Sequence, residues 1–201
     1  MVLLITVLAA YLLGSVSFAV VVSRAYRLPD PREYGSGNPG ATNVLRSGRK
    51  SAAALTLLGD SAKGWVAVFC AQQWSADGRE LAMALAAVAV IIGHMYPLFH
   101  KFKGGKGVAT ALGVLLGLNW ILALGTLMTW ITIAFFFRYS SLAALVSAVF
   151  SAFFALILFN VAHPFVWSVT LVAVLLIWRH RSNIRNLLAG KERKLGAKAA
   201  A

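Results

Sequence analysis

Residues 108–137 read VATALGVLLGLNWILALGTLMTWITIAFFF, thirty consecutive positions without a charged side chain. A helix that crosses the hydrocarbon core of a bilayer needs about 20 residues, within a range of about 17–25. The stretch is therefore too long for one membrane helix and short for two. Gly113, Gly117 and Asn119 lie where a helix could break. We predict two short helices that meet near residues 117–120; a single tilted span with Arg138 outside is the alternative.

Five further apolar stretches surround this one, at residues 2–22, 51–74, 80–99, 141–160 and 164–178. Hydrophobic residues make up 60% of the 201-residue chain and charged residues only 12%, about half the charged share of a soluble domain. This composition excludes a water-soluble domain, a disordered chain and a DNA-binding domain. Since helices satisfy their own backbone polar groups in lipid, we predict an all-α fold, a polytopic membrane helix bundle.

The basic residues predict the orientation of this bundle. The chain has 19 Lys and Arg against six Asp and Glu, and the basic residues gather at 24–50, 101–106, 138 and 179–198. Cytoplasmic loops carry an excess of Lys and Arg, so we expect the N-terminus outside and the C-terminus in the cytoplasm. An even number of crossings must then separate Lys106 from Arg138, which gives about seven transmembrane helices. We expect one integral-membrane domain over 1–195 and a disordered tail over 196–201.

Three segments have the composition of a binding or catalytic site. The first is the loop at residues 32–46, REYGSGNPGATNVLR. Its glycines allow positive φ and close approach of the backbone to a ligand, and successive N–H groups in such a loop can form an anion-binding concavity. An ordinary flexible loop would have a similar composition. The polar side chains packed beside many basic residues favour a site for phosphate or another polar ligand.

The second segment, residues 93–110, reads GHMYPLFHKFKGGKGVAT and surrounds Lys106 with glycines. A glycine loop that leads into a helix N-terminus offers N–H groups and a favourable dipole to an anion. The spacing is not that of a nucleotide-binding P-loop, because Gly107 follows the lysine and Thr110 comes four places later. Contact of the lysines with anionic lipid headgroups is the alternative, but it leaves the glycines unexplained.

The third segment is split between residues 138–141 and 179–185, at the ends of two predicted helices. Ser141, His180 and Asn183 can converge there on the two loops, and His180 and Asn183 share a helix face. Asp60 and Lys63 lie inside a predicted span at a spacing that permits an ion pair, and we expect them to stabilise the bundle. His94 is interpreted as a packing residue. Paired cysteines and clusters of His or carboxylates are absent from the sequence, so no metal site or cofactor is expected.

Three anion-friendly segments at one membrane face indicate a substrate with at least one phosphate. The sequence lacks the H-x-x-x-x-D dyad, a Ser-His-Asp set and an Asp-rich Mg²⁺ motif. An enzyme of this kind would act by positioning and by stabilising charge, and it would need an activated substrate. A transporter or channel for a phosphorylated polyol is the alternative function, and a non-catalytic lipid-binding subunit is a weaker third.

These residues resemble the bacterial acyl-phosphate:glycerol-3-phosphate acyltransferases. The resemblance rests on GSGNPGATNVLR (35–46), GHMYPLFHKFKGGKGVAT (93–110), RYSSLAA (138–144) and HRSNIRNLLAGKE (180–192), and it extends over nearly the whole chain. It implies a seven-helix enzyme of the cytoplasmic (inner) membrane whose active site faces the cytoplasm. The implied reaction moves a fatty acyl group from acyl phosphate to the 1-hydroxyl of glycerol 3-phosphate, giving lysophosphatidic acid and phosphate.

The resemblance also implies roles for individual residues. The loop around Ser36 would grip acyl phosphate, and Lys106 would be the centre of a cradle for glycerol phosphate. The implied catalytic residues are Ser36, Arg46, Lys106, Ser141, His180 and Asn183, and the implied substrate-binding residues are Gly37, Asn38, Gly40, Asn43, Gly104, Gly105 and Gly107. The implied partners are the two substrates, membrane lipids and an enzyme that produces acyl phosphate, with no nucleic acid.

The chain departs from the family pattern at two positions. Ala144 stands where many relatives have a second serine. Asn186 stands where relatives often have an arginine, and Arg185 is shifted from it by one residue. A role for the missing hydroxyl does not apply here, and the phosphate-binding role of that arginine is not assured.

Overall fold

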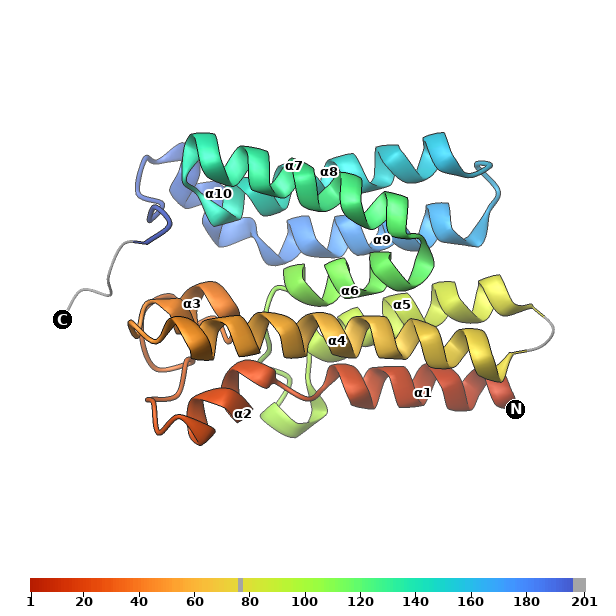
Figure 1. The fold of residues 1–201 in the computed structure, drawn as a ribbon, viewed down its shortest axis with the longest axis horizontal. Helices are drawn as coiled ribbons and strands as arrows, with labels where there is room; N and C mark the ends of the chain where they lie inside the picture. Colours follow the sequence, from red (N-terminus) through yellow and green to blue (C-terminus); the bar gives the residue numbers. More distant parts are fainter. Residues whose placement is uncertain (76–77, 197–201) are drawn as a thin grey trace.

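The computed structural model describes residues 1–75 and 78–196. Every regular element assigned within these residues is a helix, as the composition predicted. Figure 1 shows two layers of helices that run along one common axis. The lower layer contains α1 (Val2–Gly14), α2 (Phe18–Ala25), α4 (Lys50–Trp74) and α5 (Arg79–Met95). The upper layer contains α7 (Trp120–Phe137), α8 (Ser140–Leu158) and α9 (Pro164–Arg179), and α6 (Val108–Leu118) lies between the layers.

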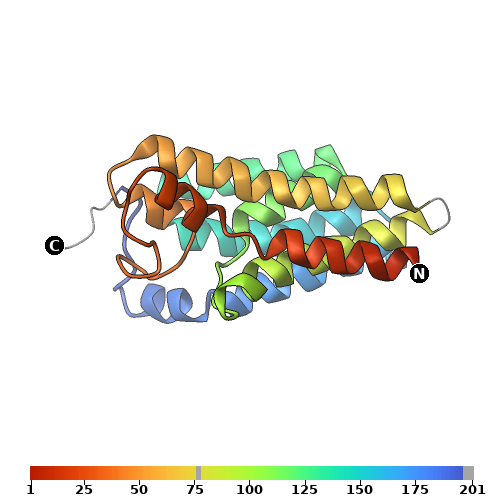
Figure 2. The ribbon, with the colours of Figure 1, turned by 90° about the horizontal axis from the view of Figure 1, so that it is seen from below.

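Three short helices complete the structure: α3 (Ala41–Leu45), the 3-10 helix η1 (Leu98–His100) and α10 (Arg181–Leu188). Figures 1 and 2 both place α3, α10 and the start of α4 at one end of the bundle, with the N-terminus at the other. We call the first of these ends the site end. The tail expected to be disordered comprises residues 196–201. Of these, only residue 196 belongs to the described residues, and 197–201 lie outside them.

Four helices are long and apolar enough to cross a membrane, and the bent pair α1–α2 makes up to five. The four are α4, α7, α8 and the segment Arg79–His100, whereas α6 and α9 are apolar but shorter. Large apolar side chains such as Phe135, Phe136 and Val149 lie exposed on the outside of the bundle, as expected of a surface that meets lipid rather than water. The prediction of a multi-helix membrane protein is confirmed.

The predicted break in residues 108–137 is confirmed, and it lies at Asn119. The Asn119 Oδ1 accepts hydrogen bonds from the N–H groups of Ile121 (2.9 Å) and Leu122 (3.0 Å) and so caps α7. Gly113 has another function, because a Cβ there would overlap the carbonyl oxygen of Ser61 on α4. The glycine therefore permits close packing of α6 against α4, and the asparagine ends the helix.

The first apolar stretch was expected to form one span, and in the structure it is a bent pair of helices that can form one broken span. Residues 2–22 divide into α1 and α2, which meet at an angle of 41°. The bend leaves backbone carbonyls at its centre without helical partners. The Lys63 ammonium, buried in α4, donates hydrogen bonds to the carbonyl oxygens of Gly14 (3.0 Å) and Val16 (2.6 Å). A side chain almost fifty residues away thus stabilises the break.

Lys63 also forms the ion pair that the sequence predicted. Its Nζ lies 2.9 Å from Oδ1 of Asp60, and both residues are only 2% exposed. On the other side of Asp60, the His94 Nδ1 lies 3.6 Å from the same oxygen and 3.2 Å from the Thr110 hydroxyl. This buried polar network joins α4, α5 and α6 to the bend between α1 and α2.

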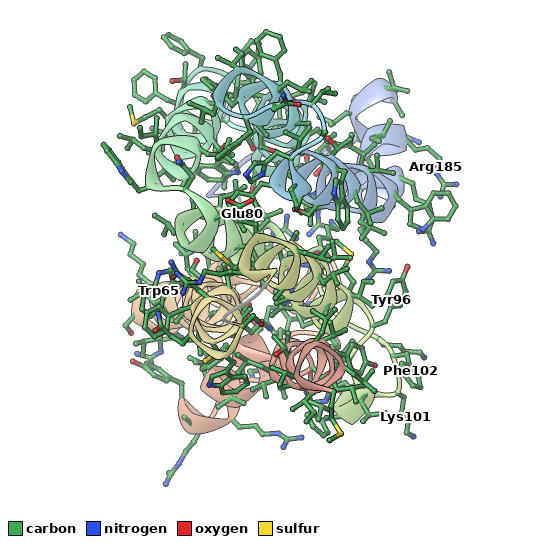
Figure 3. The ribbon with its side chains drawn as sticks, turned by 90° about the vertical axis from the view of Figure 1, so that its right-hand side faces the viewer. Trp65, Glu80, Tyr96, Lys101, Phe102 and Arg185 are labelled. Carbon is green, nitrogen blue, oxygen red and sulfur yellow. The ribbon has the colours of Figure 1, made fainter. Side chains whose placement is uncertain are left out.

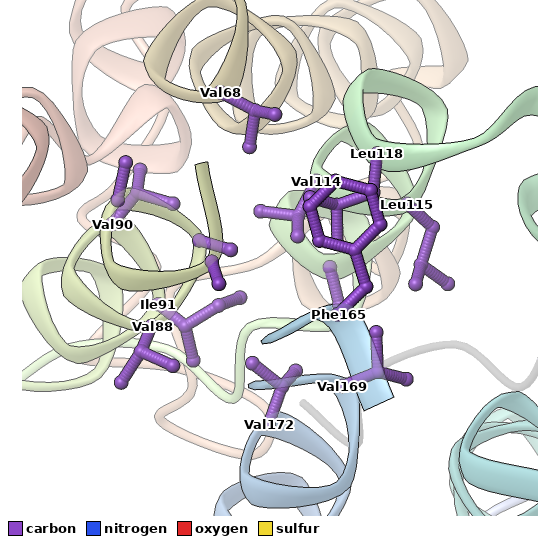
Figure 4. Packing of buried hydrophobic residues seen from close by; sticks show 14 of the residues in the cluster. Val68, Val88, Val90, Ile91, Val114, Leu115, Leu118, Phe165, Val169 and Val172 are labelled. Atoms are coloured by element: carbon purple, nitrogen blue, oxygen red, sulfur yellow. The ribbon is translucent and has the colours of Figure 1, made fainter. Parts of the chain in front are cut away.

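The hydrophobic core fills the space between the layers. Figure 4 shows Ile91 of α5, Val114 of α6 and Val172 of α9 directed toward the space between their helices. Figure 3, which looks along the helices, shows Trp65 and Tyr96 at opposite sides of the lower layer and Arg185 at the periphery of the upper layer. The contacts within the buried hydrophobic cluster hold the helices on which the site residues lie in fixed positions.

We expect Lys63→Met to destabilise the protein by about 3–5 kcal/mol, because it leaves the buried Asp60 carboxylate without its cation. Thermal unfolding of purified protein in detergent measures the effect. Lys50→Met, at the exposed start of the same helix, is the matched control, and the double variant Asp60→Asn/Lys63→Met should recover most of the loss. Unfolding of Lys63→Met at the wild-type temperature would contradict this account.

Candidate active site

The predicted site residues surround one large cavity at the site end of the bundle. Its volume is about 740 Å³. Ten of the thirteen predicted residues line it: Ser36, Asn38, Gly40, Asn43, Arg46, Lys106, Gly107, Ser141, His180 and Asn183. A second cavity of about 260 Å³ lies beside it and includes Gly37 and Gly104, while Gly105 lines neither cavity. The structure therefore brings the three sequence segments together.

The loop at residues 32–46 is held by a buried asparagine. The Asn43 side chain donates hydrogen bonds to the carbonyl oxygens of Pro31 (2.7 Å) and Tyr34 (3.1 Å), and its Oδ1 accepts one from the Ser36 N–H (3.0 Å). The same Oδ1 accepts from the Arg46 guanidinium at 3.3 Å. Asn43 thus fixes the positions of both Ser36 and Arg46 at the cavity wall.

The glycine loop before α6 is packed against its surroundings. The N–H groups of Gly104 and Gly105 donate to the carbonyl oxygens of Met95 and His94, and a Cβ on Gly105 would overlap the His94 ring. From the other side, the Arg179 guanidinium donates to both glycine carbonyls, at 2.9 Å for Gly104. In this structure these two glycines shape the loop, and their amides do not face the cavity.

The groups that do face the cavity follow directly along the chain. The N–H groups of Gly107, Val108 and Ala109 have no hydrogen-bond acceptor among the described residues, and all three residues line the cavity. They form the first turn of α6, beside the Lys106 ammonium. Free N–H groups at a helix N-terminus together with a cation make a favourable anion site.

Lys106 belongs to a hydrogen-bonded chain that crosses the cavity. Its ammonium donates to Oδ1 of Asn183 (2.5 Å), and the Asn183 amide in turn donates to the Glu192 carboxylate (2.7 Å). The Ser141 hydroxyl donates to the same carboxylate oxygen at 2.6 Å. Three predicted site residues are therefore oriented by Glu192, which the sequence analysis missed.

Burial sets the protonation of the two titratable groups predicted for the site. It lowers the pKa of Lys106 to about 8, while the nearby Glu192 charge raises it and the Arg179 and Arg46 charges lower it further. Burial also lowers the pKa of His180 to about 4, so its ring is neutral at physiological pH. The Nδ1 lies 2.7 Å from the Leu176 carbonyl oxygen and must carry the ring hydrogen. The Nε2 is left as a hydrogen-bond acceptor.

The cavity changes character with depth. Arg46, Lys106 and Arg193 give its mouth a positive potential, since Glu192 is the one carboxylate that lines this part among the described residues. Further in, the lining is mostly apolar and comes largely from α6, α7, α8 and α9, with Asp60 and His94 on the side of α4 and α5. Within residues 1–75 and 78–196, no group of three His, Cys, Asp or Glu is placed to hold a metal ion.

The two positions that depart from the family pattern have simple placements. Ala144 lines the large cavity, where a serine would add a hydroxyl. Arg185 lines the smaller cavity and is directed to the periphery of the molecule in Figure 3. Asn186 is exposed, and its carbonyl oxygen accepts the N–H groups of Lys191 and Glu192, which turns the chain back toward the cavity.

Comparisons with known proteins identify the family. The model of the family described as glycerol-3-phosphate acyltransferase matches residues 4–190. A glycerol-3-phosphate acyltransferase of Burkholderia pseudomallei (strain K96243) is 60% identical over 197 residues, which cover 98% of this chain and 97% of the relative. One of Ralstonia nicotianae (strain ATCC BAA-1114 / GMI1000) is 62% identical over 192 residues, which cover 94% and 92%.

Solved structures agree with these sequence matches. Crystal structures of PlsY (YgiH), an integral membrane glycerol 3-phosphate acyltransferase, superpose with TM-scores of 0.90 for the glycerol 3-phosphate form and 0.87 for the lysophosphatidic acid form. Both are 36% identical to this chain. Each alignment covers 96% of this chain, and the two alignments cover 96% and 95% of the respective solved chains. The resemblance drawn from the motifs is confirmed, and the chain belongs to the glycerol-3-phosphate acyltransferase family.

Proposed function

We propose that this enzyme transfers a fatty acyl group from acyl phosphate to the 1-hydroxyl of glycerol 3-phosphate, releasing lysophosphatidic acid and phosphate. One observation carries the proposal. A single cavity joins a cationic mouth to an apolar interior, as a substrate with a phosphate at one end and a hydrocarbon tail at the other requires. The titles of the two PlsY structures name glycerol 3-phosphate and the lysophosphatidic acid product, which supports the same substrates here.

The phosphate of glycerol 3-phosphate would lie between Lys106 and the first turn of α6. Arg46 supplies a second cation, and Ser141 and Asn183, which line the same cavity, supply further hydrogen-bond donors. The neutral His180 can accept a hydrogen bond from a glycerol hydroxyl at Nε2. The loop at Ser36, Gly37, Asn38 and Gly40 would then hold the acyl phosphate. These roles follow from the residues that share the cavity.

The reaction needs little covalent chemistry from the protein. The 1-hydroxyl oxygen forms a bond to the acyl carbonyl carbon, the bond from that carbon to the phosphate oxygen breaks, and the hydroxyl proton leaves with the departing phosphate. The nearby cations stabilise the negative charge that develops on the carbonyl oxygen and on the leaving phosphate. A positively charged mouth without a dedicated base suits this chemistry.

The transporter hypothesis does not fit the family, whose named members are acyltransferases. We propose instead a bacterial inner-membrane enzyme with seven crossings, in which α6 and α9 also span. Arg138 follows α7 and Arg179 ends α9, and both helices end at the site end (Figure 1), which therefore faces the cytoplasm by the positive-inside rule. Acyl phosphate would come from a separate enzyme on the same side of the membrane.

We expect Lys106→Ala and Ser36→Ala each to lower kcat/KM for acyl transfer by at least about a hundredfold, because each removes a group that holds a phosphate. The assay is turnover of palmitoyl phosphate by purified protein, with palmitoyl-CoA as the donor that should fail. Lys103→Ala is the matched control, since Lys103 is exposed in the same loop as Lys106. Wild-type turnover by both site variants would reject the assignment.

The KM for glycerol phosphate should rise above pH 8. Lys106, whose pKa is about 8, is a cation below that pH and progressively loses its charge above it, so the KM should increase up to about tenfold per pH unit between pH 8.5 and 10. Lys106→Arg tests the cause, because a guanidinium stays charged throughout this range. The variant should show no such rise even if its overall rate is lower. A flat wild-type profile to pH 10 would contradict the proposed role.

Glu192 should act through its neighbours. Glu192→Gln keeps an oxygen that accepts from Ser141 and Asn183 but removes the charge that raises the pKa of Lys106. We expect it to retain most activity at pH 7 and to move the alkaline rise of the KM to lower pH, whereas Glu192→Ala should lose about tenfold or more. Equal losses in both variants with an unmoved pH profile would indicate a purely structural role.

A further inference from the structure

The lining of the large cavity can be followed along five helices, and it reaches deepest on α6, which begins inside the bundle rather than at the site end (Figure 1). Counted from the end of each helix that lies nearer the site, the innermost lining residue is the tenth or eleventh position beyond the end residue. These residues are Asp60 on α4, Leu118 on α6, Thr126 on α7, Ser151 on α8 and Ser168 on α9. With a rise of about 1.5 Å per residue, the lining extends about 15–17 Å along each helix, and on α6 this length starts at Val108, next to the proposed phosphate site.

Closely packed side chains lie beyond these innermost lining residues, toward the far end of the bundle. Leu122, Ala123, Ala155 and Phe165 are buried members of the hydrophobic core and do not line the cavity. The Phe165 ring packs edge-on against Phe159, with centroids 5.4 Å apart. Figure 4 shows Phe165 near Leu115 and Leu118 in the same hydrophobic cluster, and unlike these two leucines Phe165 does not line the cavity. The cavity therefore has a solid floor and does not continue to the far end of the bundle.

Two of these innermost residues, Ser151 and Ser168, are small and present no free hydroxyl to a tail. The Ser151 Oγ donates to the Ala148 carbonyl oxygen at 2.8 Å, and the Ser168 Oγ donates to that of Phe165 at 3.1 Å. Because both hydroxyls are satisfied within their own helices, the two serines can face hydrocarbon without leaving a buried polar group unpaired. Larger side chains at these positions would shorten the cavity.

We infer that this floor selects acyl chains by length, with Ser151, Ser168 and Leu118 as the residues that set the limit. The inference rests on the proposed function. An extended hydrocarbon advances about 1.3 Å per carbon for a C–C bond of about 1.5 Å, so the cavity below the helix ends accepts about 12–13 carbons. The carbonyl carbon and the carbons next to it lie at the mouth, so the floor fits acyl groups of about 14–16 carbons.

The test measures donor preference in a series of acyl phosphates from 10 to 18 carbons. Ser151→Leu and Ser168→Leu should each raise the ratio of the rate with a 12-carbon donor to that with a 16-carbon donor by about tenfold or more. Each methylene that no longer fits should lower kcat/KM about fourfold, equivalent to about 0.8 kcal/mol. Leu118→Ala should change the preference in the opposite direction, toward longer chains.

Val149→Leu is the matched control, because Val149 lies on α8 but is 57% exposed on the outside of the bundle. It should leave the profile unchanged. In all four variants the KM for glycerol phosphate should stay within about twofold of wild type, since the phosphate end of the cavity is remote from the floor. Thermal unfolding of each variant separates a change of preference from a loss of fold.

Two outcomes would overturn the inference. Equal rate losses for every chain length in the folded leucine variants would show that the floor does not contact the end of the tail. An unchanged profile in all variants would show that the tail leaves sideways between α4 and α7, which flank the cavity. Either outcome leaves the proposed function intact, whereas a wild-type enzyme without turnover of any acyl phosphate would reject that function itself.

Discussion

The rest of the structure depends on the interactions of the buried Lys63 ammonium with Asp60 and with the α1–α2 bend. A cation in a bilayer-spanning helix needs partners of opposite charge or dipole, and this one takes the Asp60 carboxylate together with two carbonyls of the α1–α2 bend. The bend places α2 and the loop that follows it over the site end. Through Asp60, the same network reaches His94, whose ring and carbonyl pack against Gly105. One ion pair thus connects both phosphate-facing loops to the bundle.

Much of this architecture could be predicted because the signals are local. Apolar length fixes where helices lie, and the break at Asn119 follows from one capping side chain. The bend at Ser15–Ser17 was not predicted, because Gly14, Ser15 and Ser17 are tolerated in membrane helices and the stabilising lysine is distant in sequence. Gly113 was interpreted as a helix breaker, yet it serves close packing against α4. A glycine in a sequence shows that a side chain is absent, but it does not show which neighbouring group packs against the backbone there.

The site was predictable to a similar degree. Ser36, Arg46, Lys106, Ser141, His180 and Asn183 come from three segments, and the structure places them around one cavity as expected. Glu192 was missed because no sequence motif marks a carboxylate whose function is to orient other polar groups, here Ser141 and Asn183. Its signal was available, as a lone acid within the basic stretch after the last helix. The depth of the cavity depends on how five helices align, which no single segment encodes.

The Glu192 contacts have a consequence for ions other than the substrates. Ser141 has one hydroxyl hydrogen, and in this structure the carboxylate already takes it. Any anion that binds to Ser141 must therefore displace an internal negative charge, and a weak monovalent ion such as chloride gains too little to do so. A phosphate ester, with more charge and more acceptor oxygens, gains enough from Lys106, Arg46 and the helix end. The resting site thus holds an internal carboxylate that a substrate phosphate must replace at Ser141.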